Sequence, residues 1–185
     1  AGLLLTGALH EDGLADTADA LGGAHTREKL HQILKDSRIG TFGAAALGIS
    51  LLLRASLLVQ LGPDAESALI VTQCLSRLAP VWLMSALPYV SSASKSRSVV
   101  NGSVPQALFG SLWGIGVLFP LVARGVISPD GAAWLIVSCA GGAILCGWRF
   151  ARRAGGITGD FLGATQQVTE TIGLVAMVAA GSREP

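Results

Sequence analysis

Long apolar segments separated by short polar connections dominate the hydropathy pattern of this chain. A helix needs about 20 mostly apolar residues to cross a bilayer, and five segments meet this requirement: residues 41–62, 68–90, 104–127, 131–150 and 162–180. Their internal glycines and prolines are tolerated in membrane helices, because neighbouring helices satisfy the freed backbone groups. The pattern therefore predicts an all-α, polytopic integral membrane protein whose residues 1–185 form a single transmembrane domain.

Two further segments complete the predicted fold. Residues 1–9 are apolar and lead directly into a polar motif, as expected for a truncated helix whose beginning precedes this sequence. In residues 24–40, Leu30, Ile33 and Leu34 share one helical face while the other faces are rich in charge. This second segment is expected to be a short amphipathic helix at the membrane interface.

Composition supports the membrane class and argues against two others. The chain is 51% hydrophobic and 14% charged, whereas soluble domains carry about 25% charged residues. A net charge of +1 is too small for a broad basic surface, so no nucleic-acid partner is expected. Cys74, Cys139 and Cys146 lie inside apolar segments without paired spacing, which indicates packing residues and not a zinc or disulfide framework.

The basic residues of the connections predict how the helices are oriented. Lys and Arg in alternate connections number nine on one side of the membrane and two on the other. The more basic side is normally cytoplasmic, so residues 24–40, 91–103 and 149–160 are expected there. The acidic motif described next falls on the same side, which allows polar segments far apart in sequence to meet.

The acidic motif follows the first apolar segment. On a helix, Asp12, Asp16 and Asp19 stand at positions i, i+4 and i+7 and project from one face, where their charges repel. A cation lowers that repulsion, and oxygen-only ligands favour Mg²⁺ or Mn²⁺ over zinc. A solvated helix start with Asp12 as the N-cap has the same spacing, so both interpretations stay open.

A glycine-rich loop, GGITGD at residues 155–160, directly precedes the last apolar segment. Backbone amides at such a helix start can bind an anion, and Asp160 can bind a cation. A plain turn between helices has the same composition.

Three charged residues lie in the interior of the apolar segments, away from the segment ends. Arg77 and Glu170 are costly to expose to lipid, so each is expected to face a partner or an aqueous cavity inside the protein. A structural ion pair and a substrate contact explain them equally well. Arg54 lies eight residues from the end of its segment, from where its side chain can reach the interface.

Four blocks of this sequence resemble the adenosylcobinamide-GDP ribazoletransferase (cobalamin synthase) family. They are TGALHEDGLADTAD at residues 6–19, KDSRIGTFG at 35–43, the pair Ser76-Arg77, and GGITGDFLGA at 155–164 followed by Glu170. The blocks occur in the family's order, and the resemblance leaves out the family's N-terminal part. Glu11 stands where the family usually has an apolar residue, and Ala20 where it often has glycine.

The resemblance implies a reaction, a cofactor and a location. In this family the ribose hydroxyl of α-ribazole, or of its 5'-phosphate, attacks the cobinamide-side phosphorus of adenosylcobinamide-GDP, and GMP leaves. Such transfer across a pyrophosphate needs a divalent ion, here Mg²⁺, together with a base and cations near the phosphates. A multi-pass protein of the bacterial inner membrane with a cytoplasmic site is implied, and a homo-oligomer is compatible with it.

The resemblance also implies roles for individual residues. Asp12, Asp16 and Asp160 are the expected metal ligands, and Asp19 is a ligand or the general base. His10 is a weaker candidate base, because on a helix it points about 160° away from Asp12. The expected substrate contacts are Lys35, Arg38, Arg77, Thr158, Gly159 and Glu170.

Two other classes of protein share parts of this pattern. A CDP-alcohol type membrane phosphotransferase also has an Asp-rich helix, but with a longer acidic spacing than this chain has. A transporter would use Arg77 and Glu170 along an ion path and would not need the cytoplasmic carboxylates.

Overall fold

A computed structural model describes residues 2–90 and 102–181, and within these ranges the chain is helical without any strand. Most of the connection at residues 91–103 lies outside the described residues. The elements are α1 (Gly2–Thr6), α2 (Leu9–Gly23), α3 (Arg27–Ile33), α4 (Thr41–Leu61), the short 3-10 helix η1 (Gly62–Asp64), α5 (Ala65–Ser76), α6 (Leu78–Ala86), α7 (Val104–Ala123), α8 (Pro129–Ala154) and α9 (Gly159–Gly181).

Local sequence signals account for several helix ends. Ser103 caps α7 in a capping box with Gln106, and Ser128 caps α8 directly before Pro129. α8 ends at Gly155, whose φ of 85° is the left-handed conformation that glycine adopts without strain.

Three predicted boundaries differ from the structure. The apolar start of the chain is not continuous with the motif helix, because Gly7 and Ala8 both have φ of 60° and separate α1 from α2. The predicted span 68–90 is broken between α5 and α6 at Arg77, and its helical part ends at Ala86. The interfacial helix α3 is shorter than predicted, although Leu30 is buried as its apolar face required.

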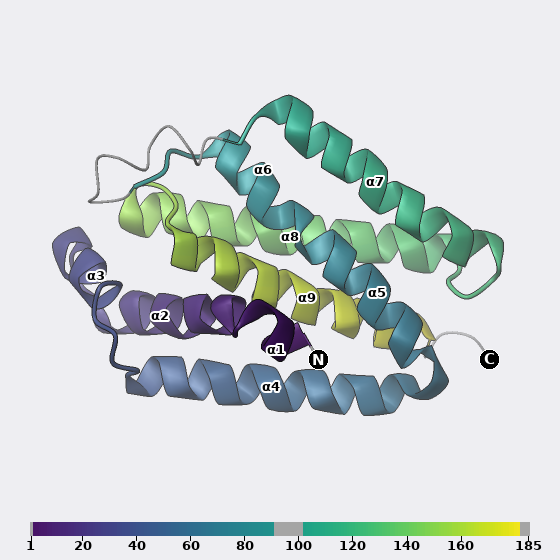
Figure 1. The fold of residues 1–185 in the computed structure, drawn as a ribbon, viewed down its shortest axis with the longest axis horizontal. Coiled ribbons are helices and arrows are strands. Elements are labelled where there is room, and N and C mark those ends of the chain that lie inside the picture. Colours follow the sequence, from purple (N-terminus) through teal and green to yellow (C-terminus); the bar gives the residue numbers. More distant parts are fainter. Residues whose placement is uncertain (1, 91–101, 182–185) are drawn as a thin grey trace.

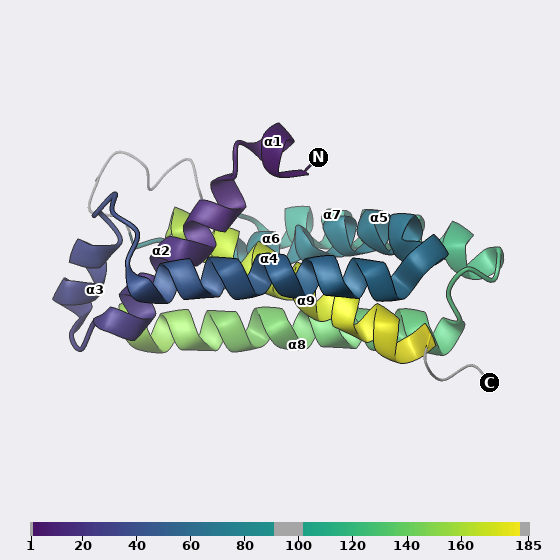
Figure 2. The ribbon, with the colours of Figure 1, turned by 90° about the horizontal axis from the view of Figure 1, so that it is seen from below.

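α9 is the central helix of the bundle. It contacts α2, α4, α5, α6 and α8, and it passes between α4 and α8 when the bundle is seen from below (Figure 2). One apolar cluster includes Val71, Leu135 and Leu174, and a second joins Leu30 and Phe150 to Phe161. Because α9 contributes to both clusters, its position determines how the two ends of the bundle are arranged.

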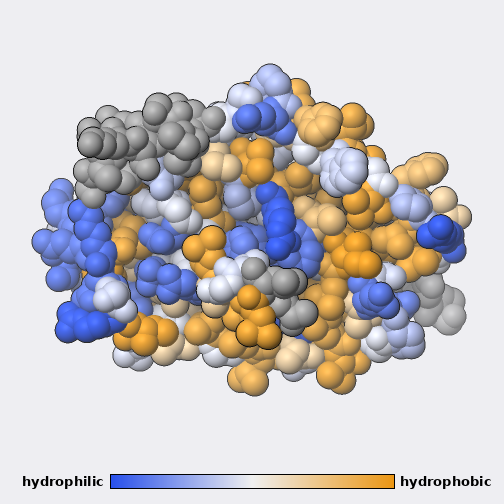
Figure 3. All heavy atoms as spheres, viewed as in Figure 1, coloured by the Kyte–Doolittle hydropathy of each residue, from blue (hydrophilic) through white to orange (hydrophobic). Residues whose placement is uncertain are grey.

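Large hydrophobic side chains are exposed over much of the outer surface, as the membrane prediction requires. Three segments are long and apolar enough to cross a membrane, namely Thr41–Ala86, Val104–Ala123 and Pro129–Ala154. In the most apolar 18-residue stretch of each segment, no more than a third of the residues are buried in the protein. Hydrophobic side chains cover much of the visible face along α4 and α7, while hydrophilic ones gather at the α3 end (Figure 3). The chain is therefore a helical membrane protein.

Five crossings stay a prediction, because three segments of the described residues are long and apolar enough to cross a membrane. The 46-residue segment Thr41–Ala86 would measure about 70 Å if straight, more than twice a bilayer core, and it turns back at η1 (Figure 1). α9, predicted as the fifth span, is not among the three segments within the described ranges.

The polar segments of interest lie at one end of the bundle. The end of α2, all of α3, the start of α4, the end of α8 and the start of α9 meet there (Figure 1). This arrangement agrees with the prediction that residues 24–40 and 149–160 share one side of the membrane.

Candidate active site

The acidic motif meets the last helix where α2 crosses α9. A Cβ atom added to Gly13 would lie 2.7 Å from the carbonyl oxygen of Asp160 and 3.3 Å from the Cα atom of Gly163. Glycine at these positions lets the two backbones touch, which brings Asp12 and Asp16 alongside Asp160. The predicted meeting of the first and last polar motifs is thus present.

The carboxylates at this crossing influence each other electrostatically. The pKa of Asp16 is raised from 3.8 to about 6, first by burial and then by the negative charges of Asp12, Asp160 and Asp19. The pKa of Asp160 is also raised, mainly by burial, with a further contribution from Asp12. The site therefore carries excess negative charge that a bound cation would relieve.

The donor set suits a cation that is only partly coordinated by protein. Among residues 2–90 and 102–181, no three His, Cys, Asp or Glu side chains are grouped closely enough to hold one metal ion, so the three-carboxylate site predicted from Asp12, Asp16 and Asp160 is not preformed. Mg²⁺ at phosphate-transfer sites commonly uses one or two carboxylates and takes its other ligands from water and substrate phosphates. The residues present fit that kind of binding.

Asp19 is on the same helix but makes different contacts. The residue is 8% exposed, and its carboxylate accepts hydrogen bonds from the backbone N–H groups of Gly40 at 2.7 Å and Gly43 at 2.8 Å. These two amides belong to the start of α4, so Asp19 joins α2 to α4. Sequence reasoning assigned Asp19 to the metal or the base and did not identify this link.

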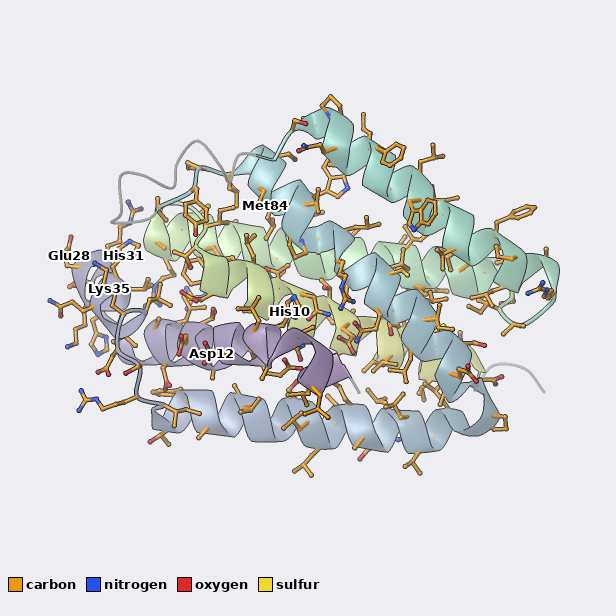
Figure 4. The ribbon with its side chains drawn as sticks, in the orientation of Figure 1. His10, Asp12, Glu28, His31, Lys35 and Met84 are labelled. Atoms are coloured by element: carbon orange, nitrogen blue, oxygen red, sulfur yellow. The ribbon has the colours of Figure 1, made fainter. Side chains whose placement is uncertain are left out.

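The segment after α3 is basic and exposed. The side chains of Lys35 and Arg38 are accessible, and Arg38 forms a bidentate pair with Asp36 through contacts of 2.9 and 2.7 Å. These hydrogen bonds hold the pKa of Asp36 down at about 2. Figure 4 shows Lys35 beside His31 and Glu28 at the α3 end of the bundle, so a phosphate group can approach Lys35 from solvent.

The glycine-rich loop is held by neighbouring backbone. Ile157 and Tyr89 form a parallel bridge, in which Ile157 N–H donates to Pro88 O at 2.9 Å and Val90 N–H to Ile157 O at 2.8 Å. A Cβ atom on Gly156 would collide with Pro88 O. The shape of the turn therefore explains why glycine stands at positions 155 and 156, in agreement with the interpretation of this loop as a plain turn.

The next residues of the loop begin α9. Thr158 is nearly buried, and its hydroxyl accepts a hydrogen bond from Phe161 N–H at 3.3 Å, so it caps the helix. Gly159 is exposed. Of the two predicted contacts, Gly159 is the one that solvent and a ligand can reach.

His10 lies at the α2–α9 crossing. A Cβ atom on Gly163 would lie 3.3 Å from the His10 Cα atom, and the His10 side chain is half-buried. Figure 4 places His10 toward the middle of the bundle and Asp12 nearer the α3 end. The helix α2 begins at Leu9 with Ala8 as N-cap, so the alternative in which Asp12 is the N-cap is wrong.

The intramembrane charges form a network that the sequence predicted only in part. Arg54 donates to Glu170 at 2.5 Å and Gln167 at 2.7 Å, and lies 3.5 Å from Glu11. Gln166 donates to the second Glu170 oxygen at 2.8 Å. The prediction that Glu170 faces the interior is confirmed, because its side chain is fully buried.

The positions of two arginines differ from those predicted. Arg54 does not extend to the interface, since it pairs with Glu170 inside the bundle. The prediction that Arg77 faces the interior is wrong, because its side chain is exposed at the α5–α6 junction and bonds to Gln73 of the preceding turn. Hydropathy shows that a charge in a span needs a partner, but the partner depends on helix register.

Two further arginines that sequence reasoning did not select lie beside the glycine loop. A Cβ atom on Gly155 would lie 2.9 Å from a guanidinium nitrogen of Arg27, and Arg153 donates to Ala24 O at 2.6 Å. Both side chains link the α3 region to the end of α8. The sequence shows that the connections containing Arg27 and Arg153 are basic, but no motif singles out these two residues.

These features define a polytopic helical membrane protein with an acidic, cation-attracting site and accessible basic residues at one end of its bundle. A family model for cobalamin-5-phosphate synthase matches residues 1–178, and the chain belongs to this family.

Curated relatives agree with the family match. The chain is 43% identical over 185 residues to an adenosylcobinamide-GDP ribazoletransferase of Rhizobium meliloti, covering 96% of this chain and 70% of the relative. It is 40% identical over 188 residues to the protein of that name from Shewanella piezotolerans, covering 98% and 71%. The same name belongs to a Sinorhizobium medicae protein that is 43% identical over 186 residues, covering 95% and 69%. No solved structure matches this chain significantly.

Proposed function

We propose that this protein joins adenosylcobinamide-GDP to α-ribazole or α-ribazole 5'-phosphate. A ribose hydroxyl attacks the cobinamide-side phosphorus, the bond from that phosphorus to the bridging oxygen breaks, and GMP leaves with that oxygen. The products are adenosylcobalamin, or its 5'-phosphate, and GMP. The observation that carries this proposal is the α2–α9 crossing, which sets Asp12 and Asp16 beside Asp160 in a chain of the cobalamin-5-phosphate synthase family.

Asp12, Asp16 and Asp160 would supply the carboxylates for Mg²⁺, one or two of them binding the ion directly, with its other ligands coming from water and substrate phosphates. When bound, the ion neutralises pyrophosphate charge and helps to orient the attacking hydroxyl. The raised pKa of Asp16 supports this assignment, because burial and, after it, the neighbouring carboxylate charges disfavour the ionised form, and a bound cation would offset both.

Other side chains would bind phosphate and move the proton. Lys35, Arg38 and Arg27 are exposed at the same end of the bundle, and arginine suits bidentate phosphate contacts. His10 lies at the helix crossing, and its imidazole is the candidate acceptor of the hydroxyl proton. Glu170 is buried against Arg54, so we assign it to holding α9 and not to substrate.

The proposed orientation places the site at the cytoplasmic face of a bacterial inner membrane, with five crossings formed by α4, by α5 with α6, and by α7, α8 and α9. The first two crossings lie within the apolar segment Thr41–Ala86, and α7 and α8 are the other two apolar segments. The basic connections at the α3 end support this orientation.

The direct test uses purified full chain in detergent or liposomes with adenosylcobinamide-GDP, α-ribazole and Mg²⁺. We expect GMP and adenosylcobalamin in equal amounts, dependent on both substrates. Hydrolysis of adenosylcobinamide-GDP without cobalamin, or transfer from a CDP-alcohol instead, would overturn the proposal. Vectorial uptake of a substrate into liposomes without chemical change would favour the transporter alternative.

A further inference from the structure

The Asp19 carboxylate completes the start of another helix. Gly40 immediately precedes α4 and Gly43 is its third residue, so their N–H groups have no acceptor within the helix. A capping box normally satisfies these two amides with side chains of the same helix. Here Asp19 accepts from both, at 2.7 and 2.8 Å, from 21 and 24 residues earlier in the chain.

Glycine is required at positions 40 and 43 because a side chain there would have no room, and not because of the backbone conformation. Gly40 has φ of −96°, which any residue adopts, and Gly43 lies in the first turn of α4. A Cβ atom at either position would collide with the Asp19 carboxylate, and at Gly43 it would also lie 2.8 Å from Ala15 O. Asp19, Gly40 and Gly43 therefore form one fitted unit, which we call the Asp19 clasp.

The Asp19 clasp controls where the basic segment emerges. It fixes both ends of residues 20–39, which contain α3, Lys35 and Arg38, and Arg38 is only two residues from Gly40. At the other end, Asp19 is close enough to Asp16 for its charge to raise the Asp16 pKa. The clasp thus sets the distance between the acidic crossing and the residues suited to phosphate.

We propose that Asp19 is a positioning residue, which caps α4 from α2 and holds the segment of Lys35 and Arg38 beside the acidic site, and that it is neither the general base nor a metal ligand. This inference rests on the proposed transferase function. Its physical reason is that both carboxylate oxygens already accept N–H groups at the positive end of a helix, and protonation would weaken these charge-assisted bonds.

The decisive variant moves the cap from α2 to α4. Asp19→Ala removes the carboxylate and clears the space beside Gly40, and Gly40→Ser then supplies an ordinary hydroxyl N-cap that can be neither a general base nor a carboxylate ligand. Asp19→Ala alone should lower kcat/KM by roughly 10- to 100-fold through misplacement of the basic segment. The kcat of the double variant should lie within about tenfold of the wild-type kcat. Loss of a general base would lower kcat by more than this.

Gly40→Ser in the presence of Asp19 is the matched control. It should lower the melting temperature, because its side chain collides with the carboxylate, yet raise the melting temperature of Asp19→Ala. This reversal of sign tests the clasp without any activity measurement, so it remains informative if wild type shows no transferase activity and the proposed function fails. Additive effects of the two substitutions on melting temperature would overturn the clasp.

The base assignment is tested separately by kinetics. A folded double variant whose kcat stays about 10²- to 10⁴-fold below wild type at saturating substrates would overturn the inference, since that is the loss expected for a base. If the double variant does not fold, Gly43→Ala decides, because it keeps the carboxylate but displaces it. For folded Gly43→Ala we expect a higher KM for adenosylcobinamide-GDP than in wild type, with the acidic limb of the pH profile of kcat unchanged. A wild-type KM would refute the positioning role of Asp19.

Discussion

Gly13 of α2 and Gly163 of α9 meet so closely that a Cβ atom on Gly13 would lie 3.3 Å from the Gly163 Cα atom. Asp12 precedes Gly13 directly, and Asp160 lies one helical turn before Gly163. The distance between the two helix axes therefore also sets the distance between the carboxylates. A site for phosphate chemistry that depends on two separate segments depends equally on the glycines that let these segments touch.

Gly13→Ala should separate the two helices. The added methyl group collides with the carbonyl oxygen of Asp160, which should cost about 1–3 kcal/mol in stability and lower transferase activity roughly 10- to 100-fold. Gly48→Ala on α4 is the control, because nothing lies within 4 Å of a Cβ atom there. Thermal unfolding and GMP release measure both effects, and wild-type values for Gly13→Ala would contradict this account of the crossing.

Replacing Asp16 or Asp160 with Asn should raise the Mg²⁺ concentration needed for half-maximal GMP release and lower the maximal rate. Each substitution keeps the size of the side chain and removes a charge that attracts the ion. Asp130→Asn, at the exposed start of α8, should leave the Mg²⁺ dependence unchanged. Activity that survives chelation, or both site variants behaving like wild type, would exclude the carboxylate metal site.

The raised pKa of Asp16 predicts a pH dependence of stability in the absence of metal. Its pKa is about 6 in the folded protein against an ordinary 3.8, so the folded state binds the proton more tightly. The Asp16 contribution to the free energy of unfolding should therefore fall as pH rises from about 4 to 6 and stay level above that range. Melting temperatures in EDTA, compared between wild type and Asp16→Asn across this range, isolate the contribution. A difference that grows more favourable to wild type with rising pH would contradict the predicted sign.

Arg54→Met should destabilise the protein strongly. It would leave Glu170 fully buried without its cation, and Glu11 is already buried with one oxygen lacking a hydrogen-bond partner among the described residues. Breaking such a pair typically costs about 3–5 kcal/mol. Arg77→Met is the matched control within an apolar segment, and because Arg77 is exposed its effect should stay below about 1 kcal/mol. Equal losses of melting temperature in the two variants would argue against the buried network.

Single cysteines at Ser37 and Asp130 should label from opposite sides of the membrane. Ser37 lies in the basic connection at the α3 end, whereas Asp130 lies at the start of α8 at the other end (Figure 1). In inverted vesicles a membrane-impermeant thiol reagent should reach position 37 and not position 130. Labelling of both positions from the same side would refute the proposed orientation.

The class of protein and the chemistry at its polar end follow from the amino-acid sequence alone. Apolar segments of sufficient length predict helices, because a bilayer offers no water to satisfy an open backbone. The spacing of Asp12 and Asp16 predicts a shared helical face, and charge counts predict that this face lies with the glycine loop at one end. These inferences need only local periodicity and the properties of the membrane, both of which are written along the chain.

Which charged side chains pair with each other depends on how the helices pack in three dimensions. The sequence predicts that Arg77 faces the interior and that Arg54 can reach the interface. Instead, the register of α4 against α9 buries Arg54 against Glu170, while Arg77 is exposed at a helix junction. Asp19 belongs to the same acidic face as Asp16, yet the approach of α4 directs its oxygens to two backbone amides. Both outcomes depend on how separate helices pack, which hydropathy and helical spacing do not specify, because those signals describe each helix alone.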